Sequence, residues 1–221
     1  MPALLFGSIS TLADTSELQR RAFNEAFEAH GLDWNWSRDD YVAMLGSNGG
    51  KDRVAAFARD RGQEVDAESV HATKSSIFQE LLSSSAVSAR PGVVETIQRA
   101  KQDGLQVGFV TTTSADNIRA LLTALAPQIS EESFDIVIDG SAVSAGKPDP
   151  EVYRHALAQL GVDASDAVAV EDNVGGVRAA KDAGVACIAF PNQNTADADF
   201  SAAETTVDAL DADEAVALIR P

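Results

Sequence analysis

The sequence predicts an α/β fold: a doubly wound, Rossmann-like parallel sheet of five strands, with a helical domain inserted after the first strand. From residue 90 onward, short β-branched runs alternate with amphipathic stretches, the pattern of a parallel sheet covered by helices. Residues 16–83 show repeated helical periodicity and no credible strand. We therefore expect a core domain of residues 1–15 and 84–221 and a helical cap domain of residues 16–83.

The five predicted strands are short apolar runs, one at the start of the chain and four after the proposed cap. They span residues 3–7, 105–111, 134–138, 167–172 and 185–190. Ligands of doubly wound sheets bind beyond the carboxyl ends of the strands. Polar residues that directly follow these runs are therefore the first candidates for a functional site.

The predicted helices are marked by their ends and by their apolar spacing. Pro91 and Gly104 bracket one amphipathic stretch, as expected for Pro near a helix start and Gly just past a helix end. Pro150 and Gly161 bracket a second one. Further core helices are predicted over residues 175–184 and 211–221, and cap helices over residues 17–31, 37–45, 50–62 and 68–82.

Charge and composition exclude several classes of partner. Asp and Glu number 34 against 17 Lys and Arg, and the resulting formal charge of -17 repels nucleic-acid phosphates and anionic lipids. Neither nucleic acid nor a membrane is expected as a partner. No targeting segment and no apolar run of about 18 residues is evident, so the cytoplasm is the predicted location. The single Cys187 can form no internal disulfide and is predicted to be a core residue.

Three polar motifs follow predicted strands. They are "GFVTTTS" with Thr111 and Thr112, "GKPDPEVY" with Lys147, and "VAVEDNVGG" with Glu171 and Asp172. A hydroxyl, an ammonium and a divalent cation that converge on one point supply most of what phosphoryl binding or transfer requires. Adjacent carboxylates suit Mg²⁺, which prefers oxygen ligands. The motifs therefore indicate a phosphate site.

Each of these residues also has a simpler explanation. Lys147 could be a solvated loop lysine, and Thr111 could satisfy backbone groups within its run of three threonines. Glu171 and Asp172 could cap the helix that follows them. The occurrence of all the motifs in one order on one predicted scaffold favours the phosphate site over the separate explanations.

This order of one strand, a helical insertion and four further strand and helix units resembles the haloacid dehalogenase-like superfamily. The resemblance is to its capped branch of phosphoglycolate phosphatases, β-phosphoglucomutases and xylulose bisphosphate phosphatases. It implies that Thr111 donates its hydroxyl to a phosphate oxygen and that Lys147 faces the phosphate. It also implies that Glu171 and Asp172 hold Mg²⁺.

The cap segment "GGKDRV" resembles a sugar-phosphate contact of the xylulose bisphosphate phosphatases, through Lys51 and Arg53. Both residues could equally be ordinary surface charges on a helix. The resemblance thus adds candidate ligand contacts from the cap to those from the core, where Ser8, Thr111, Thr112 and Lys147 are the predicted contacts.

The first strand departs from the family pattern. In active members it ends in D-x-D-G-T, where the first aspartate is the nucleophile and a metal ligand, and the second is the acid/base whose carbonyl also ligates the metal. Aligned on "TLADT", this chain has Gly7 at the nucleophile position and Ile9 at the acid/base position. Ser10 replaces the glycine, and Gln19 stands where phosphosugar members often carry a cap histidine.

These substitutions predict a phosphosugar phosphatase scaffold that is catalytically inactive or strongly impaired. Loss of a nucleophile typically costs about four to six powers of ten in rate. Binding of a small phosphorylated metabolite, a sugar phosphate, is expected to persist. Mg²⁺ is expected to be weakened or optional, because only Glu171, Asp172 and the Ile9 carbonyl remain as ligands.

Two alternatives stay open. The chain could be an active Mg²⁺-dependent phosphatase with a displaced nucleophile, Ser8, Ser10 or Asp14, or a metal-bound water, or it could be a partner-binding protein with a vestigial pocket. Strand alternation predicts that Ser8 points away from the side shared by Gly7 and Ile9. Asp14 is predicted to cap the first cap helix or to fix the hinge.

Overall fold

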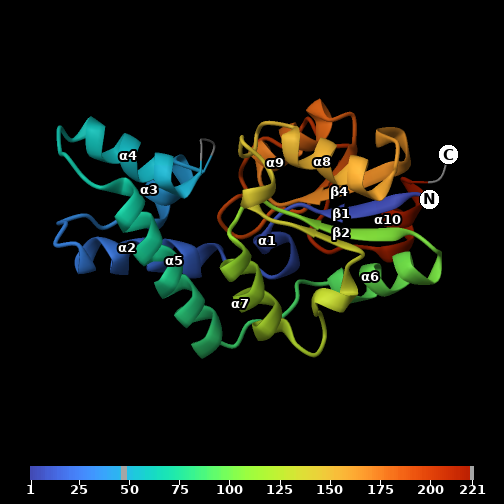
Figure 1. The fold of residues 1–221 in the computed structure, drawn as a ribbon, viewed down its shortest axis with the longest axis horizontal. Helices are drawn as coiled ribbons and strands as arrows, with labels where there is room; N and C mark the ends of the chain where they lie inside the picture. Colours follow the sequence, from blue (N-terminus) through green and yellow to red (C-terminus); the bar gives the residue numbers. More distant parts are fainter. Residues whose placement is uncertain (46–48, 220–221) are drawn as a thin grey trace.

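The computed structural model describes residues 1–45 and 49–219 and has a parallel sheet as its centre (Figure 1). The sheet has six strands in the order β3-β2-β1-β4-β5-β6, and every neighbouring pair is parallel. The strands are β1 (Ala3–Phe6), β2 (Gln106–Val110), β3 (Ile136–Ile138), β4 (Ala167–Glu171), β5 (Ala186–Ala189) and β6 (Thr205–Thr206). The predicted α/β fold is confirmed.

The strand count needs a correction, since the sequence predicted five strands and the sheet has a sixth. The added strand, β6, is two exposed residues that pair with Ile188 and Ala189 at the edge of the sheet. Two residues are too few to show an alternating apolar pattern, so sequence periodicity could not detect this strand.

The topology brings the ends of β1 and β4 together. β1 pairs with β2 on one side and with β4 on the other, and Phe6 is in register with Val170. The strand order reverses at this pair, which is where doubly wound sheets form their ligand crevice. Gly7 and Glu171, each directly after these positions, therefore lie side by side.

Helices cover both faces of the sheet. α8 and α9 lie on one face, above the strands in Figure 1, and α6 and α10 lie on the other. The core helices are α1 (Ile9–Leu12), α6 (Val93–Gln102), α7 (Ala115–Leu125), α8 (Glu151–Leu160), α9 (Val174–Asp182) and α10 (Ala212–Ala217), with single 3-10 turns at Glu131–Ser133, Gly140–Ala142 and Ala164–Asp166. The predicted helix over residues 211–221 is observed as α10, and its last two residues lie outside the described part. Cys187 is buried, as predicted.

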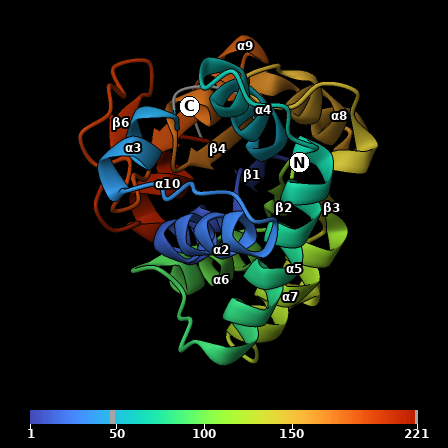
Figure 2. The same cartoon turned by 90° about the vertical axis from the view of Figure 1, so that its left-hand side faces the viewer.

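Four cap helices form a separate group beside the carboxyl edge of the sheet, facing the viewer in Figure 2. They are α2 (Ser16–Ala29), α3 (Arg38–Ala43), α4 (Gly50–Asp60) and α5 (Ala67–Ser84). Their own apolar cluster includes Phe23, Phe27 and Trp36. α5 also contributes Phe78 to the cluster under the sheet. The domain boundaries at 15/16 and 83/84 stay a prediction.

The described helices lack the combination of length and apolar character needed to cross a membrane.

Candidate functional site

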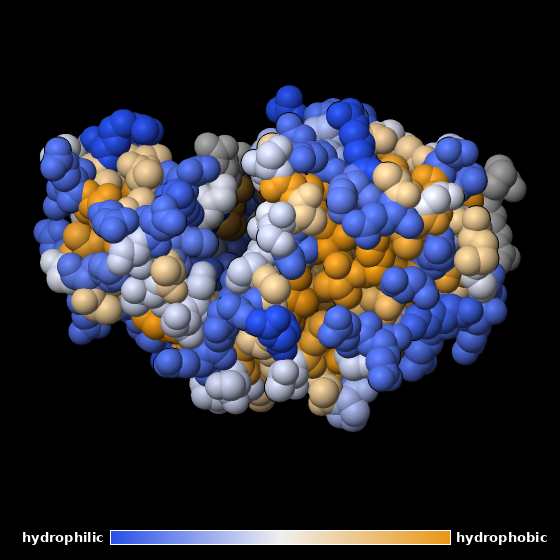
Figure 3. All heavy atoms as spheres, viewed as in Figure 1, coloured by the Kyte–Doolittle hydropathy of each residue, from blue (hydrophilic) through white to orange (hydrophobic). Residues whose placement is uncertain are grey.

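A cavity of about 840 Å³ lies between the cap helices and the carboxyl edge of the sheet, where the surface is hollowed between the two lobes (Figure 3). All of the predicted site residues except Glu171 line it. From the core these are Gly7, Ser8, Ile9, Thr111, Thr112, Lys147 and Asp172, and from the cap they are Lys51 and Arg53. Gln19, His71 and Lys74 of the cap line it as well.

The end of β1 presents no carboxylate to this cavity. Gly7 continues the strand by one hydrogen bond, from its N–H to Val170 O at 2.9 Å, and the chain then turns into α1. Ile9 is the first residue of that helix, packs in the core cluster and is 5% exposed. Its carbonyl accepts a hydrogen bond from Ala13 N at 3.2 Å. Neither Gly7 nor Ile9 offers a nucleophile or an acid/base.

The space that a side chain at Gly7 would need is already filled. A Cβ at this position would overlap the Glu171 carboxylate and the Tyr153 hydroxyl. A Cβ at Gly176 would overlap the same carboxylate from another side. The Glu171 carboxylate therefore lies in a cradle formed by two glycines, is fully buried, and does not line the cavity.

Glu171 is held there by Lys147 and Tyr153. Lys147 Nζ lies 2.7 Å from Glu171 Oε1, and the Tyr153 hydroxyl donates to the same oxygen at 2.7 Å. Lys147 also donates to Val110 O at 2.8 Å and to Gly7 O, so each of its three ammonium hydrogens has a protein acceptor. Its side chain is 9% exposed, which rules out a solvated loop lysine.

Burial has the largest effect on the pKa of the Glu171 carboxyl group. It raises the pKa of Glu171, and the charge of Lys147 opposes that rise. Burial also raises the pKa of the Tyr153 hydroxyl well above its ordinary value, with the Glu171 charge acting in the same direction. Tyr153 was missed by the sequence analysis, because only the fold shows that it reaches Gly7.

Asp172 is the acidic residue of the fourth motif that does line the cavity, and both of its oxygens have donors. Oδ1 accepts from the Ser8 hydroxyl at 2.6 Å and from Asn173 Nδ2 at 2.8 Å. Oδ2 accepts from Asn192 Nδ2 at 2.6 Å. The cap of α9 is Asn173, whose side chain accepts from Gly176 N, and not Glu171 or Asp172.

Ser8 lines the cavity, but the expected direction of its hydroxyl, which assumed that the strand runs straight to Ser8, is wrong. Strand alternation placed its hydroxyl away from the pocket, but β1 ends at Phe6 and Ser8 is the N-cap of α1. Its backbone turn directs the hydroxyl to Asp172.

The threonines after β2 line the same end of the cavity. Thr111 Oγ1 accepts from Thr113 N at 3.2 Å, so Thr111 does satisfy a backbone group, as one alternative supposed. Within residues 1–45 and 49–219, its hydroxyl hydrogen has no hydrogen-bond acceptor of its own, which leaves it able to donate to a ligand.

The predicted magnesium ligands, in this arrangement, do not fit a divalent cation. No three His, Cys, Asp or Glu side chains of residues 1–45 and 49–219 form a group that could hold a metal ion. Glu171 is turned into the glycine cradle, Asp172 already accepts hydrogen bonds on both oxygens, and the Ile9 carbonyl accepts a hydrogen bond within α1.

The cap contributes a buried cation that the sequence analysis missed. Lys74 on α5 is 4% exposed, and its Nζ donates to Gln19 Oε1 at 2.9 Å between the rings of Phe23 and Phe78. No carboxylate in the described part of the chain forms an ion pair with it. Burial, with a smaller effect of Arg53, lowers its pKa to about 7.

A signal for Lys74 was present in the sequence. It stands four residues after Val70 and four before Phe78, in the apolar stripe of α5, where a lysine is out of place.

The two predicted cap contacts and His71 surround Lys74 at the cavity. Lys51 pairs with Glu68 at 3.2 Å, and both side chains are exposed. Arg53 Nε donates to Met44 O at 3.2 Å, and its guanidinium lies over the Tyr41 ring. Burial and the charge of Lys74 lower the pKa of His71 to about 4, so His71 is neutral at physiological pH.

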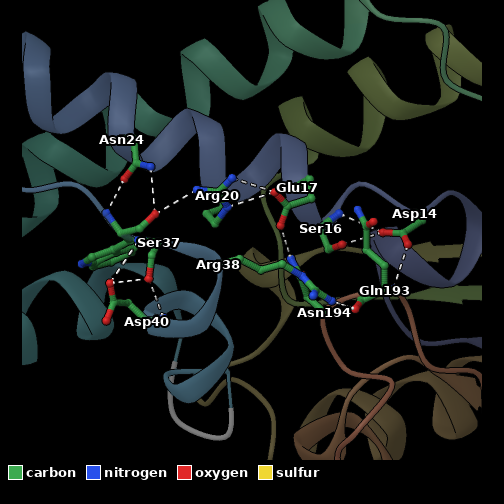
Figure 4. Close-up of polar contacts among 11 residues, drawn as sticks. Asp14, Ser16, Glu17, Arg20, Asn24, Ser37, Arg38, Asp40, Gln193 and Asn194 are labelled. Atoms are coloured by element: carbon green, nitrogen blue, oxygen red, sulfur yellow. Dashed lines mark hydrogen bonds and ion pairs between the residues drawn. The ribbon is translucent and has the colours of Figure 1, made fainter.

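The hinge side of the cavity is closed by polar contacts between cap and core (Figure 4). Asp14 Oδ1 accepts from Ser16 N at 3.1 Å and from the Ser16 hydroxyl, and Oδ2 accepts from Gln193 N at 2.9 Å. Asp14 therefore contacts both the start of α2 and the loop after β5, and its role, to cap the first cap helix or to fix the hinge, stays a prediction.

Arg38 and Glu17 complete this contact with the loop after β5. Arg38 Nε donates to Asn194 Oδ1 at 2.8 Å, and its guanidinium also contacts Gln193 O. Asn194 Nδ2 donates to Glu17 Oε1 at 2.7 Å. The hydrogen bond from Arg20 is the main cause of the lowered pKa of Glu17. We call Asp14, Glu17, Arg38, Gln193 and Asn194 the hinge latch.

Comparison with known proteins identifies several relatives. The family described as haloacid dehalogenase-like hydrolase matches residues 10–190, a segment that begins just after Gly7 and Ile9. Protein CbbY of Cereibacter sphaeroides is 40% identical over 211 residues, which cover 94% of this chain and 92% of that protein. A phosphorylated carbohydrates phosphatase of Thermotoga maritima is 30% identical over 188 residues, which cover 84% of this chain and 82% of that protein.

Solved structures of CbbY are also similar to this chain. The crystal structure of a CbbY mutant from Rhodobacter sphaeroides in complex with xylulose-(1,5)bisphosphate superimposes with a TM-score of 0.87 at 40% identity and covers 95% of both chains. A crystal structure of CbbY from the same organism contains phosphate and has the same TM-score.

Proposed function

The chain belongs to the haloacid dehalogenase-like hydrolases, and we propose that it uses this scaffold to bind a small sugar phosphate while its phosphatase activity is lost or strongly reduced. One observation carries the proposal. The tip of β1 has no carboxylate at Gly7 or Ile9, and the space beside Gly7 is filled by Glu171 and Tyr153. The family's chemistry begins with an aspartate at that tip.

The cavity supports ligand binding. Its volume of about 840 Å³ suits a small metabolite, and polar or cationic groups reach it from both sides. At the core, the Thr111 and Thr112 hydroxyls and the backbone near Ser8 would contact a phosphate, with the charge of Lys147 behind them. At the cap, Lys51, Arg53 and Lys74 would attract a second anionic group. The CbbY relative bound to xylulose-(1,5)bisphosphate favours a sugar phosphate as the ligand.

Ser8 gives a second candidate function some support. Its hydroxyl lies 2.6 Å from Asp172 Oδ1, so Asp172 could accept its proton while Ser8 Oγ bonds to phosphorus, and could return that proton to the sugar oxygen as its bond to phosphorus breaks. Water would then hydrolyse the phosphoserine to free phosphate. An ionised carboxylate is a weak base toward an alcohol, and the efficiency of a general base follows its pKa. This route would be slow, so binding remains the favoured function.

The decisive experiment compares phosphate release from a panel of sugar phosphates in the presence of Mg²⁺. The chain is set against a variant carrying Gly7→Asp, Ile9→Asp and Ser10→Gly, with Tyr153→Phe added to make room at position 7. We expect this chain to be at least ~10⁴-fold slower than the variant, the usual cost of a missing nucleophile. Melting curves of both proteins check that each is folded.

Comparable turnover by the unmodified chain would contradict the loss of activity. In that case Ser8→Ala separates the possibilities, because it abolishes turnover only if Ser8 is the nucleophile. Calorimetric titration of the unmodified chain with the sugar phosphate that the variant hydrolyses then tests binding, and absence of binding would overturn the proposed function.

A further inference from the structure

Two acidic side chains, Asp172 and Glu171, lie at the core end of the cavity, beside the carboxyl edge of the sheet, and both accept hydrogen bonds from protein donors. Asp172 accepts three hydrogen bonds of 2.6 to 2.8 Å, from Ser8, Asn173 and Asn192, and both of its oxygens are used. Mg²⁺ requires near-octahedral oxygen ligands at roughly 2.0–2.1 Å. These three donors leave Asp172 about one open acceptor position, on Oδ2, which is a small share of the oxygen ligands that Mg²⁺ needs.

Glu171 is unsuited to a cation for a different reason. Its Oε1 contacts the Lys147 ammonium at 2.7 Å and the Tyr153 hydroxyl at 2.7 Å. Its Oε2 has no hydrogen-bond partner in the described part of the chain, but it is packed against Gly176, where a Cβ would overlap it. The carboxylate is fully buried and outside the cavity lining. A dication near Oε1 would be repelled by the ammonium.

The glycine at position 7 makes this arrangement possible. Any side chain there would displace Glu171 and Tyr153 from the cradle. In the family pattern this position supplies a further carboxylate, so the glycine both lacks a ligand and leaves the space that the Glu171 carboxylate occupies.

We infer that this chain binds its phosphorylated ligand without a divalent cation, and that Lys147 and Glu171 form a neutral internal ion pair at the core end. The statement about the ligand rests on the proposed function. The statement about the cation rests only on the contacts that Glu171 and Asp172 already make. The positive charge that faces the ligand then comes chiefly from Lys74 of the cap, since the Lys147 ammonium is paired with Glu171.

The first test is a calorimetric titration of the metal-free protein with MgCl₂ alone. We expect no saturable heat from the unmodified chain and a saturable signal from a Gly7→Asp/Tyr153→Phe variant, which regains a carboxylate, loses one of the two groups that a Cβ at position 7 would overlap, and forces the other, Glu171, out of the cradle. Asn192→Asp is a second positive control, because it exchanges a donor to Asp172 for a carboxylate and leaves Gly7 untouched. Saturable Mg²⁺ binding by the unmodified chain with an affinity within about tenfold of either variant would overturn the inference.

The second test titrates the unmodified chain with inorganic phosphate, once with EDTA and once with Mg²⁺. If no cation is coupled to the anion, the two phosphate affinities agree within about twofold. A loss of tenfold or more in EDTA, about 1.4 kcal/mol, would contradict the inference and leave the proposed function standing. Absence of phosphate binding in both conditions would overturn the proposed function, while the MgCl₂ titration would still decide the cation question.

Discussion

The two ends of the cavity hold charge in opposite ways. At the core end, formed by Gly7, Lys147, Glu171 and Asp172, the buried ammonium of Lys147 lies against a buried carboxylate. At the cap end, formed by Gln19, His71 and Lys74, the partners of the buried Lys74 ammonium within residues 1–45 and 49–219 are a neutral amide and two aromatic rings. The fully compensated charge is the one next to the altered strand tip.

This difference shows what the changes at Gly7 and Ile9 affect. The charges at the core end are paired with each other, and the pair of Lys147 and Glu171 is buried. The cap end keeps an uncompensated positive charge, which is costly to bury and which an anionic ligand would neutralise. A lysine in the core end should therefore matter for stability, and the lysine in the cap end for anion binding.

The largest expected effect is on stability at the core end. Lys147→Met leaves the buried Glu171 carboxylate without its cation, and breaking a buried pair in this way typically costs about 3–5 kcal/mol. The free energy of unfolding measured with urea should fall by that amount. The Lys147→Met/Glu171→Gln double variant is the control, because removal of both charges should restore much of the loss. Equal stability of the single and double variants would contradict the account of this cluster.

The next effect concerns the stability contributed by Lys74. Its folded pKa of about 7 lies below its ordinary value of 10.5, so between these values the unfolded chain binds more protons than the folded one. Lys74 therefore makes the free energy of unfolding rise as the pH rises from about 7 toward 10.5, and it gives no pH dependence below that window. Lys74→Met should abolish this rise and should not destabilise the protein at pH 6. Urea titrations of both proteins at several pH values measure it.

Anion affinity supplies the matching test at the cap end. Only the charged form of Lys74 attracts an anion, so the dissociation constant for sulfate should rise by up to tenfold per pH unit above about pH 7. Sulfate does not titrate in this range, and His71, with its pKa of about 4, is already neutral. The neighbouring cation Arg53 keeps its charge throughout. The Lys74→Met protein should bind sulfate weakly and without this slope. A slope that persists in the variant would assign the effect to another group.

The two ends of the cavity also show how much of the site could be predicted from the sequence. Parallel topology requires residues that follow adjacent strands to meet at one edge, so Thr111, Lys147 and Asp172 could be placed in one cavity before any coordinates were known. The orientation of Glu171 could not, because it depends on the space left by Gly7 and Gly176 and on Tyr153 from another helix. Ser8 was misplaced because the rule for strands was extended past the last strand residue. Lys74 was overlooked although its position in an apolar stripe marked it.

The smallest expected effect lies in the hinge latch that joins the two ends. Arg38→Ala removes hydrogen bonds to Asn194 and to Gln193 O, which for an exposed residue should cost about 0.5–1.5 kcal/mol or less. Because the Asp14 and Glu17 contacts with this loop remain, the melting temperature should change little. Amide hydrogen exchange of residues 192–195 should become faster, since the loop loses a partner from the cap.

Arg21→Ala is the matched control for this prediction. Arg21 is also an exposed cap arginine, but it pairs with Glu25 on its own helix and makes no contact with the core. Exchange of the loop should be unchanged in Arg21→Ala and faster in Arg38→Ala. If the two variants behave alike, Arg38 does not restrain the loop after β5, and the contacts of Asp14 and Glu17 hold the loop without it. If only Arg38→Ala loosens the loop, the distance between the two charged ends is set in part by a residue that lies outside the cavity and touches neither lysine.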